Sequence, residues 1–143
     1  MTATMVMPHD ETEIKKEGTK RQGATIIFYD RQNESREEIA AAIAGRSGAV
    51  VVPAYDDVDI IAGQGSCGLE LIDQLQSINV EPDYVLSPCG GGGLMSGVAT
   101  AVKALLPKTR LIGVEPQDFD DHVRSKKTGD RVRIDNTATT LCD

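Results

Sequence analysis

Residues 87–97 read Ser-Pro-Cys-Gly-Gly-Gly-Gly-Leu-Met-Ser-Gly, so four consecutive glycines stand between two apolar segments. The segment before them, 83–87 (DYVLS), predicts a short strand. The segment after them predicts an amphipathic helix, because apolar residues recur at helical spacing: Leu94, Val98, Val102 and Leu105. A strand, a glycine turn and a helix in this order are typical of α/β proteins, in which helices connect parallel strands.

The same alternation of strand and helix continues along the chain. Further strands are predicted at 2–7, 24–29, 49–52 and 110–114. Further helices are predicted at 10–22, 35–47, 67–76 and 119–127. Capping boxes start the first two of these helices, Asp10 with Glu13 and Ser35 with Glu38, and Gly48 ends the second. The pattern predicts an α/β fold with an open, mainly parallel sheet and helices on both faces, a three-layer α/β/α arrangement.

Composition excludes several classes of protein. The chain has 143 residues, with 15 Lys and Arg against 22 Asp and Glu, a formal charge of −7. This acidic balance argues against a nucleic-acid partner, which requires a basic face. No apolar run is long enough to span a membrane, and residues 1–8 do not read as a signal sequence, so we expect a cytoplasmic protein without a membrane partner. The three cysteines, Cys67, Cys89 and Cys142, fit reduced thiols better than a disulfide framework.

The run Gly90–Gly93 predicts a phosphate site. Without Cβ atoms, the backbone can turn its N–H groups toward a ligand and approach it closely. The start of the following helix adds partial positive charge and unpaired N–H donors. A flexible linker is the alternative, but linkers are seldom flanked by an apolar strand and an amphipathic helix. The sequence therefore favours a phosphate cradle.

A second glycine stretch, Gly63-Gln-Gly-Ser-Cys-Gly68, matches the formula G-x-G-x-x-G of dinucleotide-binding proteins. That function requires a strand before the stretch and an acidic residue at the end of the next strand. Here the preceding 58–62 is short and contains Asp59, and Asp83 comes before its strand instead of after it. A tight turn leading into a helix is the favoured interpretation.

A third stretch, 113–116 (GVEP), is followed by Asp118, Asp120 and Asp121. Carboxylates after a strand can hold a hard cation such as Mg²⁺ or Ca²⁺. From residue types alone, a solvated acidic loop is favoured over a cation site.

Together these segments resemble the fold-type II pyridoxal-phosphate enzymes, most closely the threonine/serine ammonia-lyase (dehydratase) and serine racemase branch. The resemblance runs along nearly the whole chain. It is carried by VMPHDETEIKKEGTKRQGA, YDRQNESREEI, VVPAYDDVDIIAGQGSCGLEL, SPCGGGGLMSGVA, GVEPQDFDD and TTLCD. It implies the tryptophan synthase β-like fold and a pyridoxal 5′-phosphate cofactor. It also implies that the cofactor phosphate is held by Gly90, Gly91, Gly92, Gly93 and Leu94.

The resemblance implies two further sites. In racemase-like and dehydratase-like members a divalent cation, Mg²⁺ or Ca²⁺, is coordinated by residues that correspond to Glu115, the carbonyl of Phe119 and Asp121. The Arg of the E-S-R stretch lies near the substrate carboxylate in some members, which makes Arg36 a candidate. A solvated Arg just after a helix cap is the alternative for Arg36. His122 is interpreted as a surface residue rather than a ligand, because isolated histidines rarely bind metal.

The family's Schiff-base Lys lies in a S-F-K-x-R-G-A stretch, followed by S-x-G-N-H, and neither string occurs here. We therefore assign no catalytic residue and expect a middle piece of a longer enzyme. Residues 1–47 would end a small, substrate-side domain, and 48–143 would form part of a large cofactor-binding domain.

The expected activity is a dehydratase reaction that converts L-threonine or L-serine to a 2-oxo acid and ammonia. We expect the piece to be inactive alone and the intact enzyme to be a homo-oligomer. A serine racemase, a hydroxyaspartate-type dehydratase and a non-catalytic phosphate-binding module are the alternatives.

Overall fold

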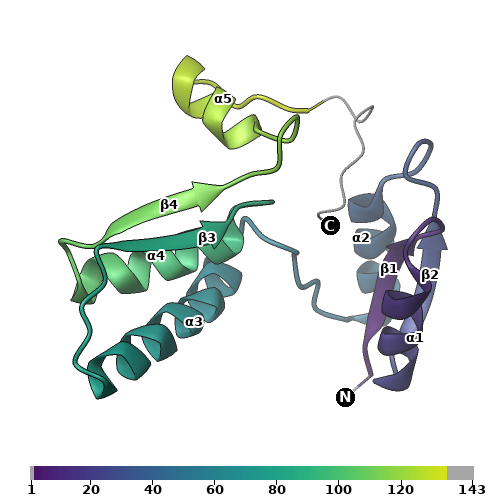
Figure 1. Cartoon of the computed structure of the whole chain (residues 1–143). Helices are drawn as coiled ribbons and strands as arrows, with labels where there is room; N and C mark the ends of the chain where they lie inside the picture. The colour runs from purple at the N-terminus through teal and green to yellow at the C-terminus, as the bar shows by residue number, and fades with distance from the viewer. Residues whose placement is uncertain (1, 135–143) are drawn as a thin grey trace. The chain divides into compact units, whose positions relative to one another are not determined.

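A computed structural model of the chain describes residues 2–134. By its internal contacts the chain forms two compact units, one ending at Val52 and one beginning at Pro53. Each unit combines helices with one pair of parallel strands (Figure 1), which confirms the predicted α/β class. The assignment of residues 1–47 and 48–143 to a small and a large domain stays a prediction.

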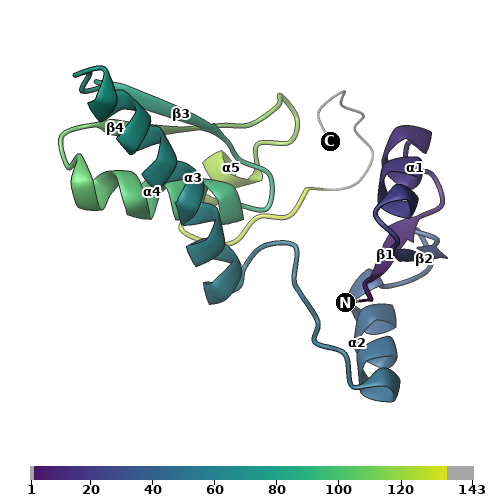
Figure 2. The same cartoon turned by 90° about the horizontal axis from the view of Figure 1, so that it is seen from below.

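The first unit contains two strands and two helices: β1 (Thr4–Pro8), α1 (Glu13–Arg21), β2 (Thr25–Tyr29) and α2 (Arg36–Ser47). The strands pair in parallel from Thr4 opposite Thr25 to Pro8 opposite Tyr29. α1 contacts β2 and α2 contacts β1, and the strands lie between the two helices (Figure 2).

The ends of α2 confirm the local signals in the sequence. The Ser35 hydroxyl accepts a hydrogen bond from the Glu38 N–H at 3.2 Å, and Gly48 ends the helix with a φ of 70°. The capping box predicted for α1 is wrong. Its N-cap is Thr12, whose side chain caps nothing, and Glu13 pairs with Lys16 at 2.8 Å instead.

The strand predicted at 49–52 is also wrong. This segment has no regular secondary structure, and Val50 and Val52 are 87% and 73% exposed. A short apolar run forms a strand only where a neighbouring strand supplies hydrogen-bond partners, and no described strand pairs with this segment.

The second unit contains three helices and two strands: α3 (Val58–Ser77), β3 (Tyr84–Pro88), α4 (Gly93–Leu105), β4 (Arg110–Val114) and α5 (Asp121–Thr128). The strands pair in parallel from Tyr84 opposite Arg110 to Pro88 opposite Val114. α3 and α4 lie beneath the strand pair in the view of Figure 1. The core of this unit joins both helices to β3: Ile72, Val85, Val98 and Val102.

The glycine stretch 63–68 lies inside α3, so the predicted turn is wrong. Asp57 is the N-cap of α3, and its carboxylate accepts hydrogen bonds from the N–H groups of Asp59 and Ile60 at 2.9 and 3.2 Å. Gly65 and Gly68 face α4 instead, whereas Gly63 does not. A Cβ on Gly68 would stand 2.9 Å from the Cβ of Ala101, so the missing side chain lets the two helices approach.

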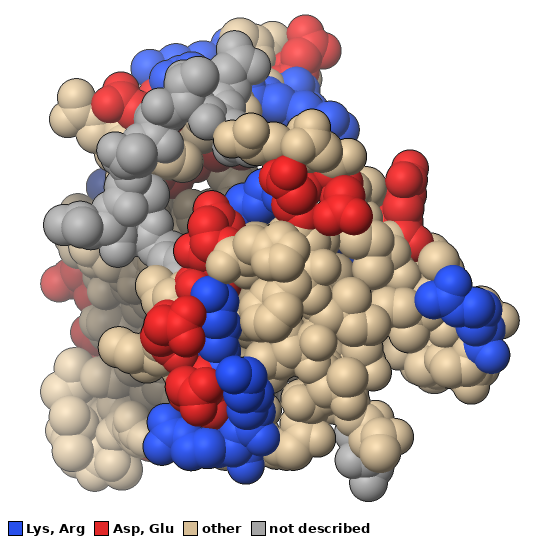
Figure 3. Space-filling model, turned by 90° about the vertical axis from the view of Figure 1, so that its right-hand side faces the viewer, with Lys and Arg blue, Asp and Glu red and all other residues tan. Residues whose placement is uncertain are grey.

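The surface shown in Figure 3 carries basic side chains beside acidic ones. Ion pairs of this kind occur along α1, where Lys20 contacts Glu17 at 2.9 Å. Exposed pairs contribute little to stability, so they mark no site. Among the described helices, none has both the length and the apolar character that crossing a bilayer demands.

Candidate functional site

The two parallel strands of the second unit bring their carboxyl ends to one edge. The glycine run follows β3 and Glu115 follows β4, and the Cys89 N–H donates to the Val114 carbonyl at 2.9 Å, which extends the pairing beyond the strands. Ligands of open α/β sheets bind beyond the carboxyl ends of the strands. The structure therefore places the predicted phosphate residues and the predicted cation residues at the edge where a ligand is expected.

The glycine loop offers a row of unpaired donors. In the part of the chain that the structure describes, the N–H groups of residues 90–95 donate to no other residue, and the Ser96 N–H makes the first bond of α4, to the Gly92 carbonyl at 2.9 Å. Gly92 has a φ of 88°, a conformation that L side chains rarely adopt. A Cβ on Gly90 would meet nothing within 4 Å, so the loop opens onto free space. Such a loop fits a phosphate group.

Tyr55 packs directly on this loop. A Cβ on Gly91 would collide with the Tyr55 ring, and a Cβ on Gly93 would stand 3.1 Å from the Tyr55 Cβ. Glycine at these positions therefore lets an aromatic ring lie against the loop backbone. The sequence offered no signal for this contact, because a single Tyr outside regular structure belongs to no motif.

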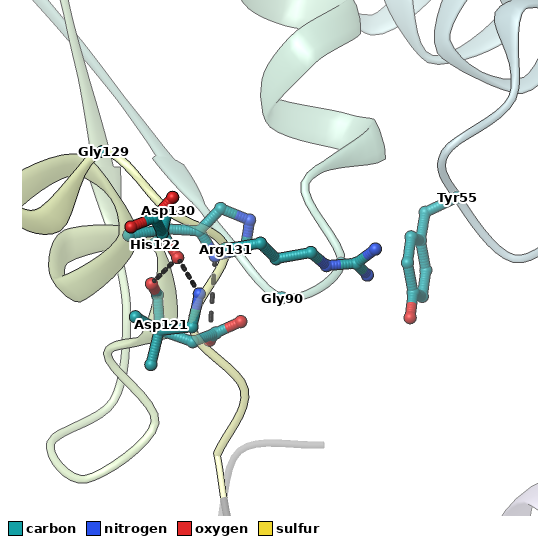
Figure 4. Close-up of a pocket in the computed structure, with 10 residues that line it drawn as sticks. Tyr55, Gly90, Asp121, His122, Gly129, Asp130 and Arg131 are labelled. Carbon is teal, nitrogen blue, oxygen red and sulfur yellow. Dashed lines mark hydrogen bonds and ion pairs between the residues drawn. The ribbon is translucent and has the colours of Figure 1, made fainter.

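A cavity of about 510 Å³ lies in front of the loop. Its walls are the loop itself, the start of α5 and the segment that follows α5, as shown in Figure 4. The volume lies within the range of small-molecule sites, which is about 300–1,000 Å³. The lining includes Tyr55, Gly90, Gly91, Asp121, His122 and Arg131.

Glu115 anchors α5 beside this cavity. Its side chain is only 5% exposed, and its carboxylate accepts hydrogen bonds from the N–H groups of His122 and Val123, each at 3.0 Å. The His122 Nδ1 also lies 2.9 Å from this carboxylate. Burial on its own raises the pKa of Glu115, but the three hydrogen bonds outweigh it and hold the pKa below its ordinary value. Glu115 is therefore a buried anion that satisfies the first N–H groups of α5.

Part of the predicted cation set comes together here. Ligand atoms of Glu115, Asp121 and His122 lie within 4.8 Å of one another. Phe119 belongs to the preceding turn, where its N–H donates to the Pro116 carbonyl at 3.1 Å. His122 is half-buried against Glu115, although the sequence suggested a surface residue. Its place directly after Asp121, in the first turn of a helix, was the signal that could have revealed it.

Arg36 is the first residue of α2, in the other unit, and its guanidinium contacts the Glu37 carboxylate at 2.9 Å. Its role toward a substrate carboxylate stays a prediction. The lining of the cavity contains no lysine among the described residues. Burial, together with the charges of Glu115 and Asp121, raises the pKa of the Cys89 thiol, which makes it a poor nucleophile.

Comparisons with known proteins show the family to which the chain belongs. The family "Pyridoxal-phosphate dependent enzyme" matches residues 1–143. The L-threo-3-hydroxyaspartate ammonia-lyase of a Pseudomonas species is 42% identical over 139 residues, which are 97% of this chain and 42% of that protein. The serine racemase of Arabidopsis thaliana is 38% identical over 137 residues, 96% of this chain and 39% of that protein.

Solved structures give the same result. A T.th. threonine deaminase superposes with a TM-score of 0.87 at 42% identity and covers 98% of this chain, which in turn covers 45% of that structure. Maize serine racemase gives a TM-score of 0.87 at 35% identity, with coverage of 98% and 41%. The chain thus spans less than half the length of these relatives. Because the family model matches all 143 residues, the chain belongs to the pyridoxal-phosphate dependent enzymes.

Proposed function

We propose that this chain supplies the phosphate-binding part of a pyridoxal-phosphate dependent ammonia-lyase. The reaction is the β-elimination of water from a hydroxy amino acid, which yields a 2-oxo acid and ammonia. The observation that carries the proposal is the loop of residues 90–94, whose N–H groups are unpaired among the described residues at the start of α4. Because the chain spans about 42% of the ammonia-lyase it resembles, the activity is proposed for the whole protein.

In the proposed reaction, the residues of this chain bind and orient the cofactor and the substrate. The N–H groups of Gly90, Gly91, Gly92, Gly93 and Leu94 would hold the cofactor phosphate, and the partial positive charge at the start of α4 would add to their attraction. When bound, pyridoxal phosphate supplies an electron sink for loss of the α-proton. Tyr55, packed on the loop, would limit the positions that a ligand can take in the cavity. Arg36 is proposed to bind the substrate carboxylate, for which the guanidinium fork is suited.

We also propose a cation site formed by Glu115, the Phe119 carbonyl and Asp121. It is supported by the close approach of the Glu115 and Asp121 carboxylates and by the burial of Glu115. Oxygen donors suit Mg²⁺ or Ca²⁺. A bound ion would hold the turn before α5 in place and so support the wall of the cavity. Millimolar Mg²⁺ or Ca²⁺ should raise the melting temperature of the chain but not that of the variant Glu115→Gln, and an equal rise in both would contradict the site.

The substrate class is drawn from the relatives. L-Threonine and L-serine are proposed first, since one relative is named a catabolic L-threonine dehydratase and another structure is a threonine deaminase. L-threo-3-Hydroxyaspartate is the second candidate, since a relative that is 42% identical is named for it. Serine racemisation is the third, from the relatives named serine racemase. A cytoplasmic location and a homo-oligomeric intact enzyme stay predictions.

Phosphate-selective binding tests the proposal directly. Isothermal titration of the chain with pyridoxine 5′-phosphate and with pyridoxine, which lack the reactive aldehyde, isolates the contribution of the phosphate. We expect the phosphate compound to bind and pyridoxine to bind far more weakly. The variant Gly92→Ala should lose this preference, because a side chain there needs a left-handed backbone and stands 3.2 Å from the His122 Nε2.

The matched control is Gly48→Ala, at the end of α2. Its φ of 70° imposes a similar backbone strain, but a Cβ there meets nothing within 4 Å. Both variants should lose about 1–2 kcal/mol of stability, since each forces alanine into the left-handed region. Only Gly92→Ala should lose phosphate binding. Equal binding by the wild type and Gly92→Ala would contradict the role of the loop.

A turnover assay completes the test. The chain is supplied with pyridoxal phosphate and Mg²⁺, and release of 2-oxo acid is followed from L-threonine, L-serine and L-threo-3-hydroxyaspartate. We expect no turnover by these 143 residues alone, because the family's S-F-K-x-R-G-A stretch does not occur in them. Turnover above that of free cofactor would show that a lysine of this chain is catalytic.

A further inference from the structure

The segment after α5 is pinned against that helix. Gly129 ends α5 with a φ of 81° and turns the chain back. The Ser125 hydroxyl then accepts a hydrogen bond from the Val132 N–H at 2.9 Å and donates one to the Asp121 carbonyl at 2.6 Å. Arg131 directly precedes this anchor, so its backbone is held at the wall of the cavity.

The Arg131 side chain crosses the cavity in front of the loop. In Figure 4 it extends past Gly90 toward the Tyr55 ring. Within residues 2–134, no hydrogen bond or ion pair joins its guanidinium to another residue. Arg124, by contrast, contacts Asp120 at 2.7 Å. Arg131 is thus a cation in the cavity without a described carboxylate partner.

The charges around the cavity favour a role for this cation in binding an anion. A phosphate monoester carries between about 1.5 and 2 negative charges at neutral pH, whereas the loop and the start of α4 offer N–H groups with only a partial positive charge. Asp121 and Asp130 line the same cavity, and the buried Glu115 lies behind His122. These carboxylates repel a bound anion. Among the described lining residues, Arg131 is the only Lys or Arg.

We infer that Arg131 pairs with the phosphate monoester held by residues 90–94 and supplies the positive charge that the loop lacks. This inference rests on the proposed function, because it concerns the same phosphate. The planar guanidinium can donate two parallel hydrogen bonds to phosphate oxygens, which a lysine cannot reproduce.

The test compares two variants of the full 143-residue chain by titration with pyridoxine 5′-phosphate and pyridoxine. Arg131→Gln should raise the Kd for the phosphate compound about tenfold or more, as expected for loss of a charge-assisted hydrogen bond. Its Kd for pyridoxine should not change. The Kd of Arg131→Lys for the phosphate compound should lie between those of the wild type and Arg131→Gln, since lysine keeps the charge but not the forked geometry of the guanidinium.

Arg133→Gln is the matched control. It removes the same charge two residues further along; both arginines are exposed, but only Arg131 lines the cavity. It should bind the phosphate compound as the wild type does. Circular dichroism melting curves of all variants verify that each is folded.

The outcomes distinguish the role inferred for Arg131 from the role proposed for the loop. If Arg131→Gln keeps the wild-type Kd while Gly92→Ala loses binding, the loop suffices and the inference about Arg131 is overturned. If Arg131→Gln and Arg133→Gln weaken binding equally, the effect is general electrostatics and the inference is overturned as well. If the wild type itself does not distinguish the phosphate compound from pyridoxine, the proposed function fails, and the inference fails with it.

Discussion

The contact between α3 and α4 makes Gly97→Ala a sharp test of the fold. A Cβ on Gly97 would stand 2.5 Å from the Gly65 nitrogen, 2.5 Å from the Ile61 carbonyl oxygen and 2.7 Å from the Gln64 carbonyl carbon. All three are backbone atoms of α3, so no side-chain rotation can make room. The helices must separate, and α4, which follows the glycine loop, must shift.

The expected change in the free energy of unfolding of Gly97→Ala follows from two opposing effects. Alanine is favoured over glycine inside a helix by about 1 kcal/mol. Overpacking of a close contact costs about 1–3 kcal/mol, and a clash with backbone belongs at the upper end. We therefore expect Gly97→Ala to lower the free energy of unfolding by about 1–2 kcal/mol.

Gly63→Ala is the matched control, since it lies in α3 and a Cβ there meets nothing within 4 Å. It should instead raise the free energy of unfolding by about 0.5–1 kcal/mol. Urea unfolding followed by far-UV circular dichroism measures both variants against the wild type. The reasoning is refuted if Gly97→Ala stabilises the chain as Gly63→Ala does, because the two helices would then not be in close contact.

Four further results are expected. Ile72→Ala, which empties a side-chain position that is 1% exposed, should cost about 2–5 kcal/mol in urea unfolding, and an effect below half a kcal/mol would contradict the described core. Ser35→Ala should cost about 1 kcal/mol through loss of the α2 cap, whereas Ser35→Asn should restore it. Because the pKa of Glu115 is lowered in the folded chain, its stabilisation is complete above the ordinary pKa of 4.5 and is lost as the pH falls through the lower folded pKa. Between about pH 5 and about pH 3, the urea midpoint of Glu115→Gln should therefore fall less than that of the wild type. Parallel curves of urea midpoint against pH would argue against the buried carboxylate. Iodoacetamide should label the exposed Cys67 well before the half-buried Cys89, as mass spectrometry of timed samples can show, and faster labelling of Cys89 would contradict its raised pKa.

Where the sequence predicted correctly, the signal was local. The strand at 110–114 has the predicted bounds, and Ser35 and Gly48 delimit α2 as expected. Gly90–Gly92 lie between β3 and α4 as predicted, and Gly93 is the first residue of α4. The two ends of α2 depend on hydrogen bonds or backbone conformations within a few residues, which the residue types themselves decide. The strand at 110–114 also needs its partner β3, which pairs with it along its whole length.

The wrong predictions concern segments whose structure depends on distant parts of the chain. Glycines at 63–68 read as a turn when taken alone, but their helix is stabilised by packing on α4, where Gly97 and Ala101 meet it. The apolar residues 49–52 read as a strand, yet no described strand pairs with them. Tertiary partners override intrinsic preference in both cases.

The α/β class, the family and a loop that suits a phosphate could all be predicted from the order of the residues, because periodicity, glycine placement and motifs are properties of that order. The surroundings of that loop, in contrast, depend on how distant segments fold together. Parallel pairing of β3 and β4 brings Glu115 beside the glycine run, and the turn after α5 brings Arg131 across the cavity. Residues so far apart along the chain share a site only because parallel strands end at the same edge of a sheet, a consequence of folding that no local pattern records.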